Sequence, residues 1–447
     1  MYTSYIGNNF LKIYRQRNNL PDEYSAIDFF NEVMFPLFYN DEEHLMHVHG
    51  SSFFQKVSDK DLVSGKSKQQ FQLERLHRDI ENKKISGSTY VGYAAETLDA
   101  TTSGQVTSLN VSINSDEIYS SWIGQALAIG VSGGYAMQIN EDNVLWTLYE
   151  GWEYYRRYLS QTPNLKDKQI ETWNGQWLNY CFGKNFDRNN KDSFFNYLKL
   201  KIVQGNLAIP TIDWVKIIFA LSRQYPNQVL TAYAYNLSQT NTTLGFINII
   251  LPKVKSLILL KELLYVLPEN GQYEKEFEEV YSTYYHFLNA CKLGIIGLKA
   301  LEPDKLRDYM PNYTSKYKIK YLKIKTKEDI INFTIYKIWI IAMLNNKKEL
   351  NALAEQVAQL LIDLENEIGK SESGRGKSSQ SRISEDFLFS KSVKEFIENL
   401  TNLMKKYSLG AEVFKKVKDA VIELPSDLFS LFVTLIQFED QFKKSNK

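Results

Sequence analysis

Three of the five histidines in this sequence lie close together, at His44, His47 and His49. If residues 45–50 form a strand, His47 and His49 share one face and could supply two ligands to a metal ion. A structural zinc site needs four ligands, and the sequence has no further cluster of His or Cys to complete this pair. We therefore expect a polar strand edge here and no metal site.

The sequence contains no recognisable phosphate-binding loop and no reactive thiol. Residues 132–135 (Ser-Gly-Gly-Tyr) lack the G-x-G-x-x-G spacing, so a glycine turn between two strands is the better interpretation. Gly65, followed by Lys and Ser, has no upstream glycine of the kind that begins a nucleoside-triphosphate loop. Cys181 has no base nearby in the sequence, and Cys291 lies among apolar neighbours, so we expect both to be core thiols.

Motifs of the common hydrolases and kinases are also missing from the sequence. It has no G-x-S-x-G elbow, no H-E-x-x-H pair and no kinase signature set. We therefore expect no catalytic residues, no cofactor and no enzymatic activity. An active site assembled from distant residues stays open as an alternative.

Local clusters of basic residues indicate a possible function more clearly. Residues 65–84 contain six basic and three acidic side chains, with amide side chains among them. Lys and Arg contact phosphates, whereas Gln can bond to base edges. The candidate nucleic-acid-binding residues of this segment are Lys66, Lys68, Gln69, Gln70, Arg75, Arg78, Lys83 and Lys84.

Three further basic clusters occur later in the chain. Residues 316–327 hold six lysines and no acid, and in a strand Lys316, Lys318 and Lys320 would lie on one face. Such a stripe could follow a phosphate backbone, or it could protect an edge strand from aggregation. The candidates in these clusters are Lys184, Arg188, Lys316, Lys318, Lys320, Lys323, Lys325, Arg375, Lys377 and Arg382.

The overall composition is that of a folded protein with several domains. The 447 residues include 53 basic and 52 acidic side chains, so any polyanion must be bound by local clusters and not by bulk charge. No apolar stretch is long enough for a membrane span, and residues 1–5 do not read as a signal peptide. We expect a cytoplasmic protein with no membrane partner.

The hydrophobic pattern predicts an α+β protein with three regions. Residues 1–140 are expected to form a mixed domain, with strands at 45–50, 106–113 and 127–135 and a strand or turn at 5–10. Residues 141–327 are expected to be mostly helical, with helices near 144–159, 193–204, 211–224, 243–266 and 273–300, and to end in the lysine-rich strand. Residues 328–447 are expected to form a four- or five-helix bundle whose Gly/Ser-rich loop, 369–382, is disordered.

The layout resembles the large subunit of type I CRISPR surveillance complexes (Cascade), with a type I-B-like subtype as one option. The similarity lies in Tyr5–Phe10, Phe30–Phe38 with Pro36, and Ser51–Phe54, and in a mixed N-terminal domain followed by a helical bundle. Many relatives carry paired Cys-x-x-Cys zinc elements, which this sequence lacks.

The resemblance implies a non-catalytic, RNA-binding and DNA-binding subunit in antiviral defence. Such a subunit recognises the motif that flanks the target (the PAM), helps to open the duplex, holds the displaced strand and offers a docking surface for a helicase–nuclease. Its partners would be guide RNA, target DNA, and the backbone, handle-binding and small subunits of the ribonucleoprotein complex. The resemblance also adds candidate contact residues. The turn residues Thr102, Ser103 and Gln105 would contact the flanking motif, and Asn8 and Asn9 would contact the guide handle or a neighbouring subunit.

A second interpretation is a helical interaction scaffold that binds no nucleic acid. In that case the lysines would only solvate strand edges and helix faces, which is their commonest role on protein surfaces.

Overall fold

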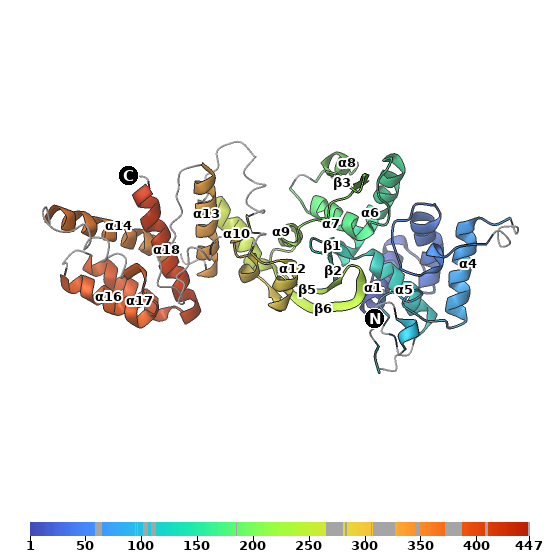
Figure 1. The fold of residues 1–447 in the computed structure, drawn as a ribbon, viewed down its shortest axis with the longest axis horizontal. Helices are drawn as coiled ribbons and strands as arrows, with labels where there is room; N and C mark the ends of the chain where they lie inside the picture. Colours follow the sequence, from blue (N-terminus) through green and yellow to red (C-terminus); the bar gives the residue numbers. More distant parts are fainter. Residues whose placement is uncertain are drawn as a thin grey trace. The chain divides into compact units, whose positions relative to one another are not determined.

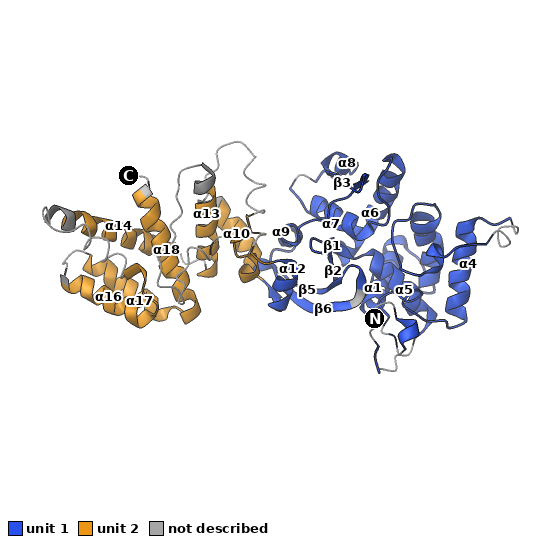
Figure 2. Cartoon of the chain, viewed as in Figure 1, with its two compact units in different colours: residues 1–252, 286–296 blue, residues 253–285, 297–447 orange. Residues whose placement is uncertain are grey.

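The chain forms two units and passes between them three times (Figure 2). In this computed structural model, unit 1 comprises Met1–Pro252 and His286–Ile296, and unit 2 comprises Lys253–Tyr285 and Gly297–Lys447. The structure describes residues 1–58, 65–93, 95, 97–101, 106–108, 113–184, 186–264, 280–281, 284–304, 306, 327–345, 348–371, 387–406 and 410–445.

Unit 1 is built around a five-stranded sheet with the order β1-β2-β5-β6-β7 (Figure 1). All neighbouring strands are antiparallel except β6 and β7, which are parallel. The strands are β1 (Ile129–Val131), β2 (Tyr135–Ile139), β5 (Val229–Asn236), β6 (Gln239–Ile250) and β7 (Ile295–Ile296). A separate hairpin is formed by β3 (Lys201–Val203) and β4 (Asn206–Ala208).

The predicted glycine turn at residues 132–135 is confirmed. It joins β1 to β2, and Gly133 and Gly134 have φ angles of 96° and 80°. Residues with a side chain rarely adopt this left-handed region, whereas glycine enters it without steric cost.

The pairing of β2 with β5 joins the two sides of residue 140 in one sheet. The sheet therefore extends across residue 140, and the first division between the two units falls after residue 252. The predicted α+β class is confirmed, because unit 1 combines the sheet with helices and the described elements of unit 2 are helical.

The helices of unit 1 cover the sheet and carry most of the large aromatic core. They are α1 (Tyr2–Asn18), α2 (Ala26–Phe29), η1 (Phe30–Tyr39), η2 (Ser52–Phe54), α4 (Lys68–Glu81), η3 (Leu98–Ala100), α5 (Ser115–Ala126), α6 (Asp142–Gln161), α7 (Ile170–Cys181), α8 (Ser193–Tyr197), α9 (Trp214–Gln224) and α12 (Phe287–Lys292). The helix predicted at 144–159 lies within α6. The helix predicted at 211–224 corresponds to α9, whose N-cap is Asp213; the Asp213 side chain accepts a hydrogen bond from the Val215 backbone N–H.

Helices α1 and α5 approach so closely that their contact requires glycine on both. A Cβ atom at Gly7 would lie 1.8 Å from Ser120 O, and one at Gly124 would lie 1.9 Å from Thr3 O. Neither backbone oxygen can move aside, so only residues without a side chain fit at these two positions. This contact fixes the N-terminal helix against the helix that leads into β1.

Unit 2 is helical in its described part, as the sequence predicts for residues 328–447. Its elements are α10 (Leu251–Leu264), η4 (Leu298–Leu301), α13 (Lys327–Met343), α14 (Lys348–Ser371), α16 (Val393–Lys406), α17 (Ala411–Glu423) and α18 (Ser426–Ser445). Residues 372–386, which include most of the predicted loop, lie outside the described residues. None of the described helices is long and apolar enough to cross a membrane.

Several sequence predictions of local structure were wrong. Residues 5–10 are part of α1, because packing on α5 overrides the low helix propensity of Gly7 and the two asparagines. Residues 45–50 form no strand, although Leu45 bonds to Phe38 and to Ile170 through its backbone. The helices predicted at 193–204 and 243–266 are interrupted, since 201–203 and 239–250 are strands. Most of the strand predicted at 106–113 lies outside the described residues.

A buried carboxyl group in the core of unit 1 has no cation paired with it among the described residues. Glu171, in α7, accepts a hydrogen bond from Gln125 Nε2 at 3.0 Å, and Tyr235 Oη donates to Gln125 Oε1 at 3.1 Å. Burial raises the pKa of the Glu171 carboxyl above its ordinary value. Folding therefore shifts this carboxyl group towards its neutral form.

The close contact of α1 with α5 makes a testable prediction. Gly7→Ala should destabilise unit 1 by about 3 kcal/mol or more, because the added methyl group meets backbone on α5. Calorimetry of the full chain measures this loss. The exposed substitution Gln16→Ala, also on α1, is the control and should leave the unfolding temperature almost unchanged. Equal unfolding temperatures for the two variants would contradict the contact.

The buried Glu171 predicts a specific pH dependence. A carboxyl group whose pKa is raised on folding makes its full contribution to the stability of the folded state at pH values below its unfolded-state pKa. This contribution is lost as the pH rises through its folded-state pKa. Glu171→Gln should therefore become progressively more stable than the wild type as pH rises from about 4. Thermal unfolding at several pH values tests this, and a stability difference that does not vary with pH would show that Glu171 is not the titrating group.

Candidate nucleic-acid interface

Helix α4 begins at a capping box that the sequence encodes. The Ser67 side chain accepts a hydrogen bond from the Gln70 backbone N–H at 3.2 Å. In return, Gln70 Oε1 accepts a hydrogen bond from the Ser67 backbone N–H at 3.1 Å. These two bonds satisfy backbone N–H groups that would otherwise lack a partner at the helix start. The Gln70 side chain is therefore engaged in the cap, and only its NH₂ group remains available to a ligand.

One face of α4 is anchored to the rest of unit 1. Leu76 and Ile80 are buried, and the buried Gln72 donates from Nε2 to Phe53 O at 3.1 Å and to Gln55 O at 3.0 Å. His77 lies between Tyr119 Oη at 2.6 Å and Asn31 Oδ1 at 3.0 Å. Burial lowers the pKa of His77, so the imidazole is neutral and serves as a structural bridge.

The predicted basic residues are distributed along α4: Lys68 is the first residue of the helix, Arg78 lies opposite the anchored face, and Lys83 follows the C-cap Asn82. Lys68, Arg78 and Lys83 are exposed and form no ion pair within the described part of the chain. Lys66 pairs with Glu74, and Lys84 lies 3.5 Å from Asp79, so these two cations are partly neutralised. Such exposed pairs contribute little to stability and exchange readily with a stronger anion.

Arg75 lies between the two faces of α4. Its Nη1 donates to Gln55 Oε1 and Lys56 O, both at 3.3 Å, and its guanidinium lies 5.2 Å from the centre of the Phe71 ring. Gln69 is half-buried. Of the eight predicted residues in this segment, Lys68, Arg78 and Lys83 are thus the best placed to contact a phosphate backbone.

The second described basic cluster does not join α4. Lys184 and Arg188 are exposed in the segment that links α7 to α8. Figure 1 shows α4 and α8 on different sides of unit 1. Within the described residues, the predicted cations therefore form two separate surfaces and not one continuous track.

The predicted residues on α1 have structural partners. Asn8 Oδ1 accepts from Ser120 Oγ at 2.6 Å, which strengthens the contact of α1 with α5. Asn9 Nδ2 donates to Asn140 Oδ1 at 3.1 Å. The remaining predicted residues lie outside the described residues, namely Thr102, Ser103, Gln105, Lys316, Lys318, Lys320, Lys323, Lys325, Arg375, Lys377 and Arg382.

The three histidines near residue 45 belong to an aromatic cluster. His44 is buried and packs on Tyr39 and Phe54, and the centre of the His47 ring lies 4.4 Å from that of Phe54. No group of three or more potential metal ligands occurs among the described residues.

The two cysteines lack the properties of nucleophiles. Burial raises the pKa of the Cys291 thiol to about 12, and it also raises the pKa of Cys181. Both groups therefore stay protonated near neutral pH, and a thiol is a far weaker nucleophile than a thiolate.

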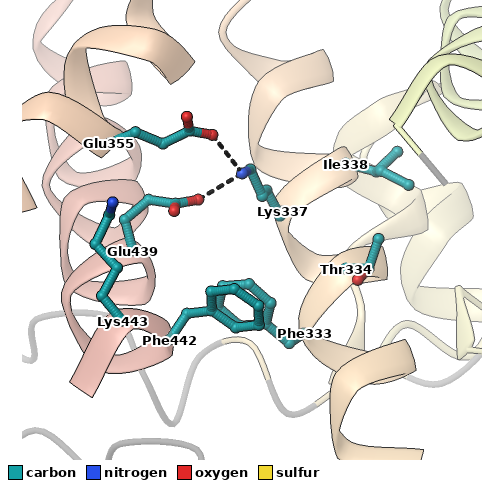
Figure 3. Close-up of a pocket in the computed structure, with 8 residues that line it drawn as sticks. All are labelled: Phe333, Thr334, Lys337, Ile338, Glu355, Glu439, Phe442 and Lys443. Carbon is teal, nitrogen blue, oxygen red and sulfur yellow. Dashed lines mark hydrogen bonds and ion pairs between the residues drawn. The ribbon is translucent and has the colours of Figure 1, made fainter. Parts of the chain in front are cut away.

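Unit 2 contains a pocket of about 360 Å³ that is lined by α13, α14 and α18 (Figure 3). Lys337 Nζ lies 2.9 Å from Glu355 Oε1 and 2.5 Å from Glu439 Oε1. The rings of Phe333 and Phe442 stack beside this group, with centres 5.0 Å apart. Burial opposes the charge of Lys337, but the two carboxylates outweigh this effect and raise its pKa.

The chemistry of this pocket is that of an ion pair and not of an active site. An ammonium group held between two carboxylates is neither a base nor a nucleophile at neutral pH. It instead connects three helices that are distant in the sequence. The sequence analysis did not identify this group, because the three charged residues are spread over about a hundred positions.

Comparison of the chain with protein-family models, with curated proteins and with solved structures finds no match.

The ion pair in unit 2 gives a third prediction. Lys337→Met should destabilise unit 2 by about 3–5 kcal/mol at neutral pH, because the buried Glu439 carboxylate loses its cation. Amide hydrogen exchange in α13 and α18 measures the loss. Adding Glu439→Gln should restore part of it, since the second substitution removes the unpaired charge.

The control for this prediction is the exposed pair Lys394–Glu398, at 3.9 Å. Lys394→Met should change stability by less than about 1 kcal/mol. Similar exchange rates in the Lys337 and Lys394 variants would show that the buried pair does not hold the helices together.

Proposed function

We propose that this chain is a non-catalytic, nucleic-acid-binding subunit of an RNA-guided CRISPR surveillance complex, in which it recognises a short motif in duplex DNA beside the target. The observation that carries the proposal is a set of three exposed cations along α4, namely Lys68 at its start, Arg78 on its outer face and Lys83 just beyond its end. The helix between them is capped at Ser67 and anchored to unit 1 through Gln72, Leu76 and Ile80.

The geometry of α4 suits a helix that contacts a duplex. The major groove of B-DNA accepts an α-helix, and contacts of Lys and Arg with phosphates fix its position. The NH₂ group of Gln70 and the side chain of Gln69, near the helix start, are the available amides for base edges. In an RNA-guided complex, base pairing with the guide carries most of the sequence specificity, so a short protein readout is sufficient.

The residues that carry the family resemblance are mainly core residues of unit 1. Phe10 packs on Phe29, and Phe30 and Tyr39 pack on Phe53, with the Tyr39 and Phe53 rings stacked at 4.0 Å. The sequence similarity therefore concerns residues that hold α1, η1 and η2 together. The order of the two units, an α+β unit followed by a helical bundle, is the layout on which the resemblance is based, and it supports the proposal as a general feature of the chain.

The other parts of the proposed function concern residues and partners beyond α4. Strand holding, duplex opening and helicase–nuclease docking would use surfaces that include the lysine-rich segment and the 369–382 loop. Guide RNA, target DNA and the other Cascade subunits are the partners that this proposal requires. A genome that encodes a repeat array with backbone and helicase–nuclease genes beside this chain is expected, and a gene neighbourhood without them would contradict the assignment to Cascade.

A scaffold without nucleic-acid binding is the second candidate function. The observation that favours it is the ion pairing at the two ends of α4, where the flanking residues Lys66 and Lys84 already have carboxylate partners. The two functions differ in salt dependence, because only phosphate binding releases counterions.

The fourth prediction concerns the exposed cations of α4. Replacing Lys68, Arg78 and Lys83 together with Gln should weaken binding to a labelled duplex and reduce the salt slope of log K by about 2 to 3. Fluorescence anisotropy between about 50 and 200 mM salt measures both quantities.

A matched control removes the same charge from unit 2. Lys394, Lys405 and Lys415 are exposed on α16 and α17, and their replacement with Gln should leave duplex binding and its salt slope unchanged. Equal slopes for the two triple variants, or no duplex binding by the wild type at about 50 mM salt, would favour the scaffold.

A further inference from the structure

The five-stranded sheet of unit 1 contains no charged residue. None of the five strands includes Asp, Glu, Lys, Arg or His. The solvent-exposed face of an antiparallel sheet normally carries polar and charged side chains. A neutral face that remains exposed therefore calls for an explanation.

Part of one sheet face is open. On β2, Gln138 faces α5 and donates to Gly124 O at 2.6 Å, so this part of the face is covered. On the next strands, Tyr233 pairs with Phe246 and Thr231 with Asn248, on the same face as Gln138. Phe246 is 61% exposed, and Val229 and Ile295 beside this row are 54% and 52% exposed.

Four aromatic rings meet where α1 crosses the edge of this open area. The ring centre of Tyr2 lies 4.6 Å from Tyr233, 5.3 Å from Phe246 and 5.8 Å from Tyr5. Tyr5 is 51% exposed. Two of the four rings thus present much of their surface to solvent, and Figure 1 shows β5 and β6 beside the start of α1.

Helix α1 continues this surface with positive charge. Its 17 residues include Lys12, Arg15 and Arg17 and no acidic residue. Tyr5, Asn9, Lys12 and Gln16 follow one another at helical spacing, and Tyr5, Lys12 and Gln16 are exposed. Arg17 lies 4.4 Å from the centre of the Trp146 ring and donates to Asn143 Oδ1.

We propose that this surface, formed by the open face of β5 and β6 and the exposed stripe of α1, binds single-stranded nucleic acid. The exposed rings of Phe246 and Tyr5 stack on bases, and Lys12, on the same stripe of α1 as Tyr5, contacts the phosphates. The Asn248 side chain lies on the same sheet face two positions from Phe246; its Oδ1 accepts a hydrogen bond from Thr231 Oγ1, and its NH₂ group can bond to base edges. This site adds to the duplex-binding function proposed for α4 and does not depend on it.

The charge distribution selects this ligand over others. A base is flat and uncharged, so it stacks on rings of a neutral face, while its phosphate needs the cations of α1. A duplex keeps its bases stacked on one another and therefore offers none to Phe246. Sheet faces with exposed aromatic rings bind single strands in this way in other proteins.

The test uses labelled oligonucleotides of twelve thymidines or twelve uridines and the full chain. Anisotropy is expected to show binding of the single strands, with Phe246→Ala and Tyr5→Ala each weakening it about tenfold. Equal affinities for the two oligonucleotides would indicate a general single-strand site, and a preference would identify DNA or RNA. The control is Ile202→Ala, at another exposed apolar position of unit 1, which should not change binding.

Two conservative variants separate ring stacking from general apolar contact. Phe246→Tyr should retain binding because it keeps the ring, whereas Phe246→Leu should lose about as much affinity as Phe246→Ala. Wild-type affinity in the Leu variant would overturn the proposal and indicate an apolar docking face for a protein. The absence of single-strand binding by the wild type would also overturn it.

The same variants show which of the two sites has failed. Phe246→Ala should leave duplex binding and its salt slope unchanged, and the triple substitution on α4 should leave the affinity for thymidine and uridine strands unchanged. Loss of duplex binding in the Phe246 variant would mean that the two surfaces are one site, which contradicts the inference.

Discussion

The backbone contact between α1 and α5 is the constraint on which unit 1 depends. At Gly7 and Gly124 the two helices touch through backbone atoms, and a methyl group at either position would overlap a carbonyl oxygen. Because α1 is held this closely, its first turn reaches β5 and places Tyr2 against Tyr233. Because the same contact holds α5, the α5 residue Tyr119 can form a hydrogen bond with His77 of α4, and this bond positions α4. Both proposed interfaces are thus fixed by one helix contact.

The two units solve the problem of a buried charge in different ways. Glu171 in unit 1 has an amide partner and, in the part of the chain that the structure describes, no paired cation, and burial raises its pKa, which shifts the carboxyl towards its neutral form on folding. Lys337 in unit 2 lies between two carboxylates and keeps its charge. The first arrangement depends on pH and the second on the presence of all three partners. Replacing a buried pair with apolar residues can be neutral, so the ion pair specifies how the helices meet more than it adds to stability.

Sequence reasoning succeeded where a local signal determined the outcome. The glycines of residues 132–135, the cap Asp213 and the amphipathic helices after residue 350 all depend on neighbours in the sequence. It failed at residues 5–10 and 243–250. The helix at Gly7 exists because α5 lies against it, and the segment at 243–250 is a strand because β5 pairs with it. Apolar runs alone do not distinguish a buried helix from a buried strand.

The candidate interface was predictable in its residue types but not in its geometry. Basic residues at 66–84 were identified from composition, and Ser67 with Gln70 is a capping signal that can be read in the sequence. The partners of these side chains could not be predicted from the sequence, because Gln55 lies beside Arg75, and Asp79 beside Lys84, only in the folded chain. The open sheet face was missed because its signal is an absence of charge over strands that are far apart in the chain. No single aromatic residue of this face indicates a binding site by itself. The rings come together only through the pairing of β5 with β6 and the position of α1.

Separate surfaces for duplex and single strand are a physical consequence of what each form of nucleic acid exposes. A duplex presents phosphates and groove edges, which α4 can meet with cations and amides. A single strand presents base faces, which only rings can cover over a comparable area. One continuous basic track would bind both forms without distinguishing them, because its affinity would come from phosphates alone. On the two proposals, the aromatic face adds the discrimination that charge cannot provide, and the rigid α1–α5 contact keeps the two surfaces at a constant separation within unit 1.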